Sequence, residues 1–264
     1  MWEDAKGQIE VSLKIAFTGK GGVGKTTLAS LFIRVLSKDE AVLAVDCDPD
    51  ANLGRALGFK DAEKIRPIVN MKEMIADRMG IKDGDKSFYQ LNPKIDDIPD
   101  SYSKNNGNIK LIVMGAVEEG GSGCMCPESA FVKSLISHLI LRRNEHVVMD
   151  MEAGVEHLGR GTAGSCDFVI TVCEPTHNSV ETAKRIEGFA KDIGVRKIYA
   201  VGNKIRSASD RIFLEKALGE IRLLESVEFS DEFLETCKEN APDLVSEDVV
   251  LKIKTIRRLL EEET

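Results

Sequence analysis

The chain has 264 residues, and 42% of them are hydrophobic, which is enough to form the core of one large α/β domain. Its 36 basic and 44 acidic residues give a net charge of −8, which argues against a general nucleic-acid binder, because such proteins need a basic surface for the phosphate backbone. The charged N-terminus lacks the apolar core of a secretory signal, and no apolar run is long enough to span a membrane, so we expect a cytoplasmic protein. In that compartment its six cysteines would be reduced, and metal binding is then a better explanation than a disulfide for any clustered pair.

A glycine-rich segment at 19–27 lies between an alternating apolar stretch at 11–17 and an apolar stretch of helical spacing at 28–36. These patterns predict a strand and a helix, and a glycine loop between them, ending in Gly-Lys-Thr, is typical of a phosphate loop. Its N–H groups and the helix N-terminus would hold phosphates, Lys25 would reach the β- and γ-phosphates, and the Thr26 hydroxyl would hold Mg²⁺. The alternative is a glycine turn before an ordinary helix. The predicted nucleotide-binding residues of the loop are Gly19, Lys20, Gly21, Gly22, Val23, Gly24, Lys25, Thr26 and Thr27.

Lys20 is a second lysine within this loop. It is either a solvated surface charge or a cation that neutralises the transferring phosphoryl group. A lysine this early in the loop resembles the deviant Walker A motif of the ParA, MinD and nitrogenase iron protein group of P-loop NTPases. The resemblance implies an α/β fold with a mostly parallel central sheet flanked by helices. It also implies that Lys20 acts across a homodimer interface on the partner's nucleotide, so that Lys20 and Lys25 are both catalytic.

A second apolar strand is predicted at 42–45, and acidic residues follow it directly. Carboxylates at this end of a strand, beside a phosphate loop, lie where Mg²⁺ and the attacking water must be handled. The segment resembles switch I of the same ATPase group. The resemblance implies that Asp48 orients or activates water, and that Asp46 and Asn52 support metal and phosphate. A capped turn is the alternative, since Asp-Pro-Asp also suits one.

We interpret residues 1–264 as a single P-loop ATPase domain, with an N-terminal extension at 1–10 and an irregular insertion at 60–108. Within the insertion, helical segments are predicted at 62–69 and 71–79, and several Pro and Gly loop signals follow. We assign no chemistry to the insertion.

A strand predicted at 109–114 leads to Cys124 and Cys126, and Pro127 is well placed as the first residue of an apolar helix. A thiol at a helix N-terminus has a lowered pKa and is a better thiolate ligand. Two thiolates cannot complete a four-coordinate nickel or zinc site, whereas a twofold-symmetric dimer would supply four. The alternative is that both are small core residues. The other cysteines are interpreted as structural: Cys47, Cys166, Cys173 and Cys237.

The segment from Gly120 to Glu128 closely resembles the Cys-x-Cys-Pro-Glu element of the CooC-type nickel-insertion ATPases, which mature carbon monoxide dehydrogenase. The similarity continues through the segments 46–50, 71–73, 154–158, 160–162 and 174–175.

A short strand at 147–150 ends in Asp150, as in a Walker B motif, and Asp150 to Gly154 fits the Asp-x-x-x-Gly of switch II. Asp150 is expected to contact Mg²⁺ through water, and the Gly154 N–H to sense the γ-phosphate. Two more buried strands are predicted at 168–173 and 197–201, with a helix at 179–193 between them.

Asn203 follows the last of these strands, and the resemblance makes it the contact to the nucleobase; a helix or turn cap is the alternative. Glu228 stands where related chains often carry a proline against the base. An apolar stripe at 249–260 predicts a helix that packs on the sheet rather than on a membrane, because the three glutamates at 261–263 would be repelled by an anionic bilayer.

Taken together, the motifs and the resemblance to the CooC-type ATPases imply an ATP-dependent metallochaperone that uses ATP, Mg²⁺ and Ni²⁺, with Zn²⁺ as the alternative ion. We expect an ATP-dependent homodimer with a client metalloenzyme, carbon monoxide dehydrogenase, and neither nucleic-acid binding nor stable membrane association. A positioning or partition ATPase of the ParA/MinD type is the alternative, and it leaves the cysteine pair unused. An electron-transfer ATPase like the nitrogenase iron protein needs two well-separated cysteines per chain, whereas this chain has one close pair.

Overall fold

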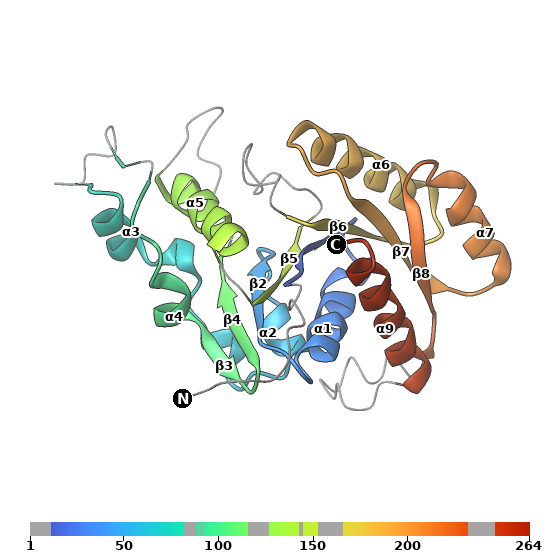
Figure 1. The fold of residues 1–264 in the computed structure, drawn as a ribbon, viewed down its shortest axis with the longest axis horizontal. Helices are drawn as coiled ribbons and strands as arrows, with labels where there is room; N and C mark the ends of the chain where they lie inside the picture. Colours follow the sequence, from blue (N-terminus) through green and yellow to red (C-terminus); the bar gives the residue numbers. More distant parts are fainter. Residues whose placement is uncertain are drawn as a thin grey trace.

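The computed structural model describes residues 12–81, 89–90, 92–115, 127–142, 145–152, 166–231 and 246–264. These residues form an eight-stranded sheet in the order β3-β4-β2-β5-β1-β6-β7-β8 (Figure 1). The strands are β1 (Lys14–Thr18), β2 (Val42–Cys47), β3 (Lys104–Asn106), β4 (Ile109–Val113), β5 (His146–Met151), β6 (Phe168–Cys173), β7 (Ile198–Ile205) and β8 (Arg222–Glu228). The α-helices are α1 (Lys25–Leu36), α2 (Leu53–Ala56), α3 (Lys72–Arg78), α4 (Ile98–Tyr102), α5 (Pro127–Arg142), α6 (His177–Asp192), α7 (Ala208–Ala217) and α9 (Glu247–Glu261).

All neighbouring strands pair in parallel except β3, which runs antiparallel to β4 at the edge. The central strands β1, β2, β5 and β6 are buried along their whole length. Their near-continuous apolar sequences suit a parallel sheet with helices on both faces. The predicted mostly parallel α/β fold is therefore confirmed.

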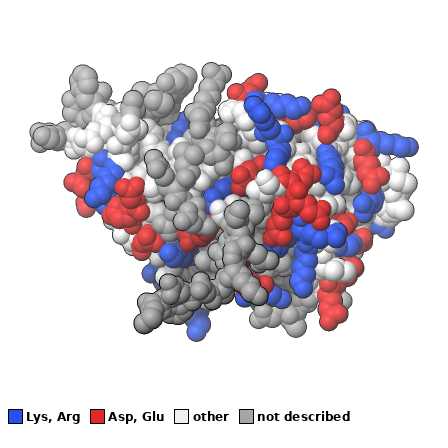
Figure 2. Space-filling view, in the orientation of Figure 1, with Lys and Arg blue, Asp and Glu red and all other residues white. Residues whose placement is uncertain are grey.

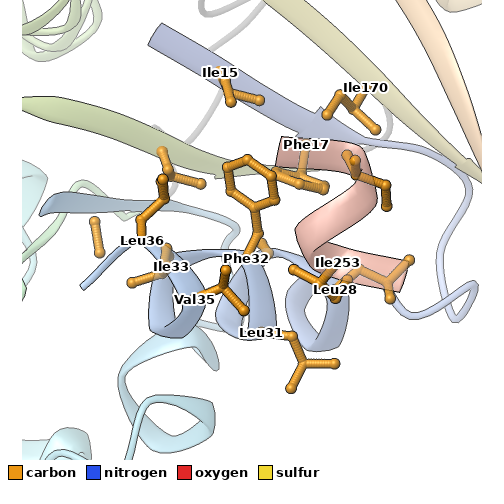
Figure 3. Packing of buried hydrophobic residues seen from close by; sticks show 14 of the residues in the cluster. Ile15, Phe17, Leu28, Leu31, Phe32, Ile33, Val35, Leu36, Ile170 and Ile253 are labelled. Carbon is orange, nitrogen blue, oxygen red and sulfur yellow. The ribbon is translucent and has the colours of Figure 1, made fainter. Parts of the chain in front are cut away.

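Alternate residues of each strand face different helical layers, as the two-residue period of a strand requires. On β1, Phe17 lies in the core formed with α1 and α9, whereas Ala16 lies in the core formed with α5. Figure 3 shows Phe32 of α1 pointing toward Phe17, and the centroids of the two rings are 5.6 Å apart. Ile253 of α9 joins the same cluster, so α1 and α9 cover one face together.

The helix predicted at 62–69 does not form. The chain makes two 3₁₀ turns, Ala62–Lys64 and Ile68–Asn70, and Ile65 and Pro67 between them are extended. The cause is Pro67, which has no N–H to donate and disfavours the helical conformation of the residue before it. The next predicted helix, at 71–79, is confirmed as α3.

The C-terminal apolar stripe packs against the domain, as predicted. Ile253, Ile256 and Leu260 of α9 are buried in the cluster that also contains α1 residues. Among the described helices, none has the combined length and apolar character that a membrane crossing requires.

Candidate functional site

The carboxyl ends of three adjacent strands meet below the glycine loop. Because β1, β5 and β2 are parallel neighbours, Asp150 lies in register with Phe17 on one side and Asp46 on the other. Ligands of open parallel sheets bind outside these strand ends. The loop after β1 therefore faces two buried aspartates.

The conformation of the loop requires glycine at its two ends. Gly19 and Gly24 have φ values of +143° and +95°. A Cβ at Gly19 would lie 2.5 Å from the Val172 carbonyl oxygen, and one at Gly24 would lie 2.4 Å from Asn203 Nδ2. Gly24 is also the N-cap of α1 and offers no side chain to cap it, so the first N–H groups of this 12-residue helix are available to a phosphate.

Lys25, the first residue of α1, is buried beside switch I. Its side chain is 7% exposed, and its Nζ lies 3.9 Å from Asp48 Oδ2. The structure thus brings together the loop lysine and the carboxylate predicted to act on water. An incoming γ-phosphate would compete with Asp48 for this lysine.

Asp46 supports the switch I turn. Its Oδ2 accepts a hydrogen bond from the Leu53 N–H (2.9 Å) and its Oδ1 accepts one from the Asp48 N–H (3.2 Å). Burial raises the pKa of Asp46 to about 7, and the nearby Asp150 carboxylate acts in the same direction. Asp46 therefore orders the turn that carries Asp48.

Asp150 is a buried carboxylate that suits a cation. Its exposed fraction is 0%, and within the described part of the chain neither of its oxygens has a well-formed hydrogen bond. Burial raises its pKa to about 6, against the opposing effects of the Thr26 hydroxyl and the Lys25 ammonium. Mg²⁺ is commonly held by one or two carboxylates together with substrate phosphates. Asp150 and Thr26 fit that requirement.

The side chain of Asn203 contacts the phosphate loop directly. It is buried, and its Nδ2 donates to the Val23 carbonyl oxygen at 2.7 Å. The adjacent Lys204 donates to the Gly22 carbonyl oxygen, also at 2.7 Å, and pairs with Glu174. The sequence predicted no role for Lys204. Locally the sequence shows only that two polar residues, Asn203 and Lys204, end an apolar strand, which does not reveal the contact with Gly22.

The remaining predicted residues occupy different positions. Lys20 is exposed on the loop, and within the described residues its side chain makes no ion pair. Asn52 is exposed just before α2, and its side chain does not cap that helix. Cys124, Cys126 and Gly154 lie outside the described residues.

Three of the cysteines interpreted as structural are buried free thiols, and the fourth, Cys237, lies outside the described residues. Burial raises the pKa of Cys166 to about 12 and that of Cys173 to about 11, and it raises that of Cys47 as well. Such thiols stay protonated and are poor metal ligands. Nowhere in the described ranges do three or more His, Cys, Asp or Glu side chains cluster as a metal site.

Comparison with known proteins assigns the chain to a family. The model of the CobQ/CobB/MinD/ParA nucleotide binding domain matches residues 14–242. The chain belongs to this family. It is thus a P-loop ATPase, and the family recognised from the loop and switch residues is confirmed.

Among its relatives, the carbon monoxide dehydrogenase accessory protein CooC of Rhodospirillum rubrum is 43% identical over 82% of this chain and 84% of its own length. An ATP-binding protein of Methanocaldococcus jannaschii is 41% identical over 85% of this chain and 88% of its own length. Among solved structures, MinD of Aquifex aeolicus superposes with a TM-score of 0.65 at 18% identity, over 95% of this chain and 98% of that one. This last likeness concerns the fold alone.

Proposed function

We propose that this protein is an ATP-dependent metallochaperone that binds nickel through Cys124 and Cys126 of two chains and assists its insertion into carbon monoxide dehydrogenase. The observation that carries the proposal is the 43% identity, over most of both chains, to a protein named as a carbon monoxide dehydrogenase accessory protein. The Cys-x-Cys pair gives this ATPase a metal-binding element that nucleotide hydrolysis alone does not need.

The place of the cysteines in the sequence, directly before α5, supports the proposal. Cys126 directly precedes Pro127, where α5 begins. Helix α5 lies in the crossover between β4 and β5, two strands that run parallel on either side of β2. The first turn of such a helix lies at the edge of the sheet formed by the carboxyl ends of the strands. That is also the edge of the phosphate loop. Nickel ligands and nucleotide would therefore share one side of the sheet.

The residues of the site divide the ATPase reaction among themselves. The N–H groups at the start of α1 and Lys25 bind the phosphates, and Thr26 with Asp150 would hold Mg²⁺, which neutralises phosphate charge when bound. Asp48 would orient the attacking water, and its pairing with Lys25 and the hydrogen bond from its N–H to Asp46 support that role. Lys20 is exposed, as a residue that reaches into a partner chain must be.

Equilibrium dialysis against Ni²⁺, with and without a non-hydrolysable ATP analogue, tests the metal site. We expect one Ni²⁺ per two chains, lost in Cys124→Ala and in Cys126→Ala. Cys173→Ala, which removes a buried thiol from β6, is the matched control and should retain nickel. One metal per chain, or nickel retained in both of the first two variants, would contradict the shared site.

The same preparations distinguish the positioning-ATPase alternative, by co-sedimentation with DNA or liposomes in the presence of ATP. On the face drawn in Figure 2, basic and acidic side chains are interspersed. The apolar residues of α9 are used in the core. Both observations favour the absence of co-sedimentation.

A further inference from the structure

The end of β7 is irregular where it passes the phosphate loop. Its pairing with β8 shifts register between Gly202 and Ile205, which marks a bulge. Within the bulge, Lys204 has φ +58°, in the left-handed region that a non-glycine residue rarely adopts. Such a conformation persists only where surrounding contacts over-determine it, and it is concentrated at functional sites.

The bulge brings two consecutive side chains to the same loop. In a regular strand, neighbouring side chains point to opposite faces of the sheet. Here Asn203 and Lys204 both donate to phosphate-loop carbonyls, to Val23 and Gly22 respectively, and each distance is 2.7 Å. These are the two residues just before Gly24, the N-cap of α1.

A third strand end holds the lysine in place. Glu174 directly follows β6, and its Oε1 accepts from Lys204 Nζ. The Glu174 backbone N–H in turn donates to Ser179 Oγ, in the first turn of α6, at 3.0 Å. Lys204 therefore bridges an anchored carboxylate and the loop.

These contacts set the direction of the donors that a phosphate needs. In a trans peptide the C=O and the next N–H point in opposite directions. Fixing the Val23 carbonyl on the β7 side therefore turns the N–H of Gly24 the other way, toward the N–H groups at the start of α1, and successive N–H groups aimed together form an anion-binding nest. Fixing the Gly22 carbonyl likewise sets the peptide whose Val23 N–H closes the loop turn on the Lys20 carbonyl oxygen at 3.4 Å.

We propose that Lys204, held by Glu174, is a positioning residue that keeps the phosphate loop in its phosphate-binding conformation. It does so from outside the glycine-rich motif and without touching the nucleotide. This inference rests on the ATPase activity of the chain and is independent of the nickel proposal.

The test compares variants in ADP binding, measured by titration calorimetry with Mg²⁺, and in ATP turnover. Lys204→Met removes the amine and keeps most of the side chain. We expect the ADP dissociation constant and KM for ATP to rise roughly tenfold, the size expected for losing a charge-assisted hydrogen bond, while kcat changes less than twofold. That split follows because the loop binds ground state and transition state alike.

Three further variants separate positioning from general stability. Lys204→Arg keeps a cation and hydrogen-bond donors, so its ADP affinity should be close to that of wild type. The ADP affinity of Glu174→Gln should lie between those of Lys204→Arg and Lys204→Met. Lys204→Gly relieves the left-handed backbone but lacks the amine, so it should bind as weakly as Lys204→Met. Lys110→Met is the matched control, since Lys110 is also ion-paired, to Asp100, and equally exposed, at 37% against 38% for Lys204.

ADP binding within twofold of wild type in Lys204→Met would overturn the proposal, and so would recovery of affinity in Lys204→Gly. An equal loss in Lys110→Met would also overturn it. If Lys204→Met does not fold, an ADP affinity of Glu174→Gln equal to that of wild type would overturn the proposal instead. Failure of the nickel experiment alone would leave these results unaffected.

Discussion

Replacing Asp150 by asparagine should make the nucleotide-free protein more stable at pH 8 while it abolishes Mg²⁺-dependent ATP hydrolysis. The carboxylate is fully buried, and within the described residues neither oxygen has a well-formed hydrogen bond. Its pKa rises from 3.8 to about 6. At ~1.4 kcal/mol per pH unit, this difference converts to roughly 3 kcal/mol by which the ionised group destabilises the native state.

The sign follows from proton binding. Between about pH 4 and 6 the native state binds a proton that the unfolded state has lost, so stability falls as pH rises through this window. Above about pH 6 the ionised Asp150 destabilises the native state by the full amount of roughly 3 kcal/mol. Asparagine removes the charge but buries an amide, which costs roughly 1 kcal/mol, so the net gain at pH 8 is roughly 2 kcal/mol. For a chain of this size that is a rise of about 5 °C in the unfolding midpoint.

The assay is thermal unfolding of wild type and Asp150→Asn in EDTA at pH 8 and pH 5, with ATP turnover measured in parallel. At pH 5, midway through this window, roughly half of the cost of Asp150 remains, so the gain from asparagine should fall from roughly 2 to below ~1 kcal/mol. Asp97→Asn is the control of opposite sign, because Arg78 lowers the pKa of that exposed carboxyl. A lower midpoint for Asp150→Asn at pH 8, or an equal rise at both pH values, would refute the reasoning.

Three further predictions concern turnover and selectivity. Lys20→Ala should bind ATP as wild type does and lose hydrolysis, because its effect is made in the transition state, whereas Lys25→Ala should lose ATP binding as well; undiminished turnover in Lys20→Ala would exclude the role across the dimer. Asp48→Asn should bind ATP with at least wild-type affinity, because the carboxylate that lies 3.9 Å from the Lys25 ammonium, and would compete with phosphate for it, is replaced by a neutral amide. This variant should accumulate as an ATP-bound dimer in size-exclusion chromatography. Asn203 donates through Nδ2 to Val23, so its Oδ1 is the atom that can accept from a base amino group; we expect ATP to bind at least tenfold more tightly than GTP, and Asn203→Ala to reduce that ratio in competition binding.

Local sequence patterns predicted the parts of the site that depend on few neighbouring residues. Glycine spacing specified the phosphate loop because only glycine fits the close approaches at Gly19 and Gly24. Apolar runs specified the buried strands because both faces of the sheet are covered. The break at Pro67 was also present in the sequence, but the apolar pattern on either side of it was given too much weight.

The features that the sequence did not predict depend on residues far apart in the chain. The expected strand at 197–201 continues to Ile205, because pairing with β8 resumes after the bulge. Nothing local to Lys204 indicates a left-handed residue or a contact with Gly22, 182 positions earlier. Likewise the Asp46–Asp150 alignment is a matter of strand register, which is set by packing of the whole sheet.

That register connects the two halves of the proposed function. Asp46 of β2 lies in register with Asp150 of β5 on one side and with Val113 of β4 on the other. β5 carries Asp150, the carboxylate proposed to hold Mg²⁺, and β4 is the strand that leads to the cysteine segment. A nucleotide that reorders Asp46 and Asp150 therefore acts on a strand adjacent to β4, which leads to the cysteines proposed to bind nickel. If the two sites are coupled, linkage requires the effect to be mutual, so the factor by which an ATP analogue changes Ni²⁺ affinity must equal the factor by which Ni²⁺ changes affinity for the analogue. Unequal factors would mean that nickel and nucleotide were not measured on the same assembly, and a factor of one in both directions would leave ATP hydrolysis, not ATP binding, as the step that moves the metal.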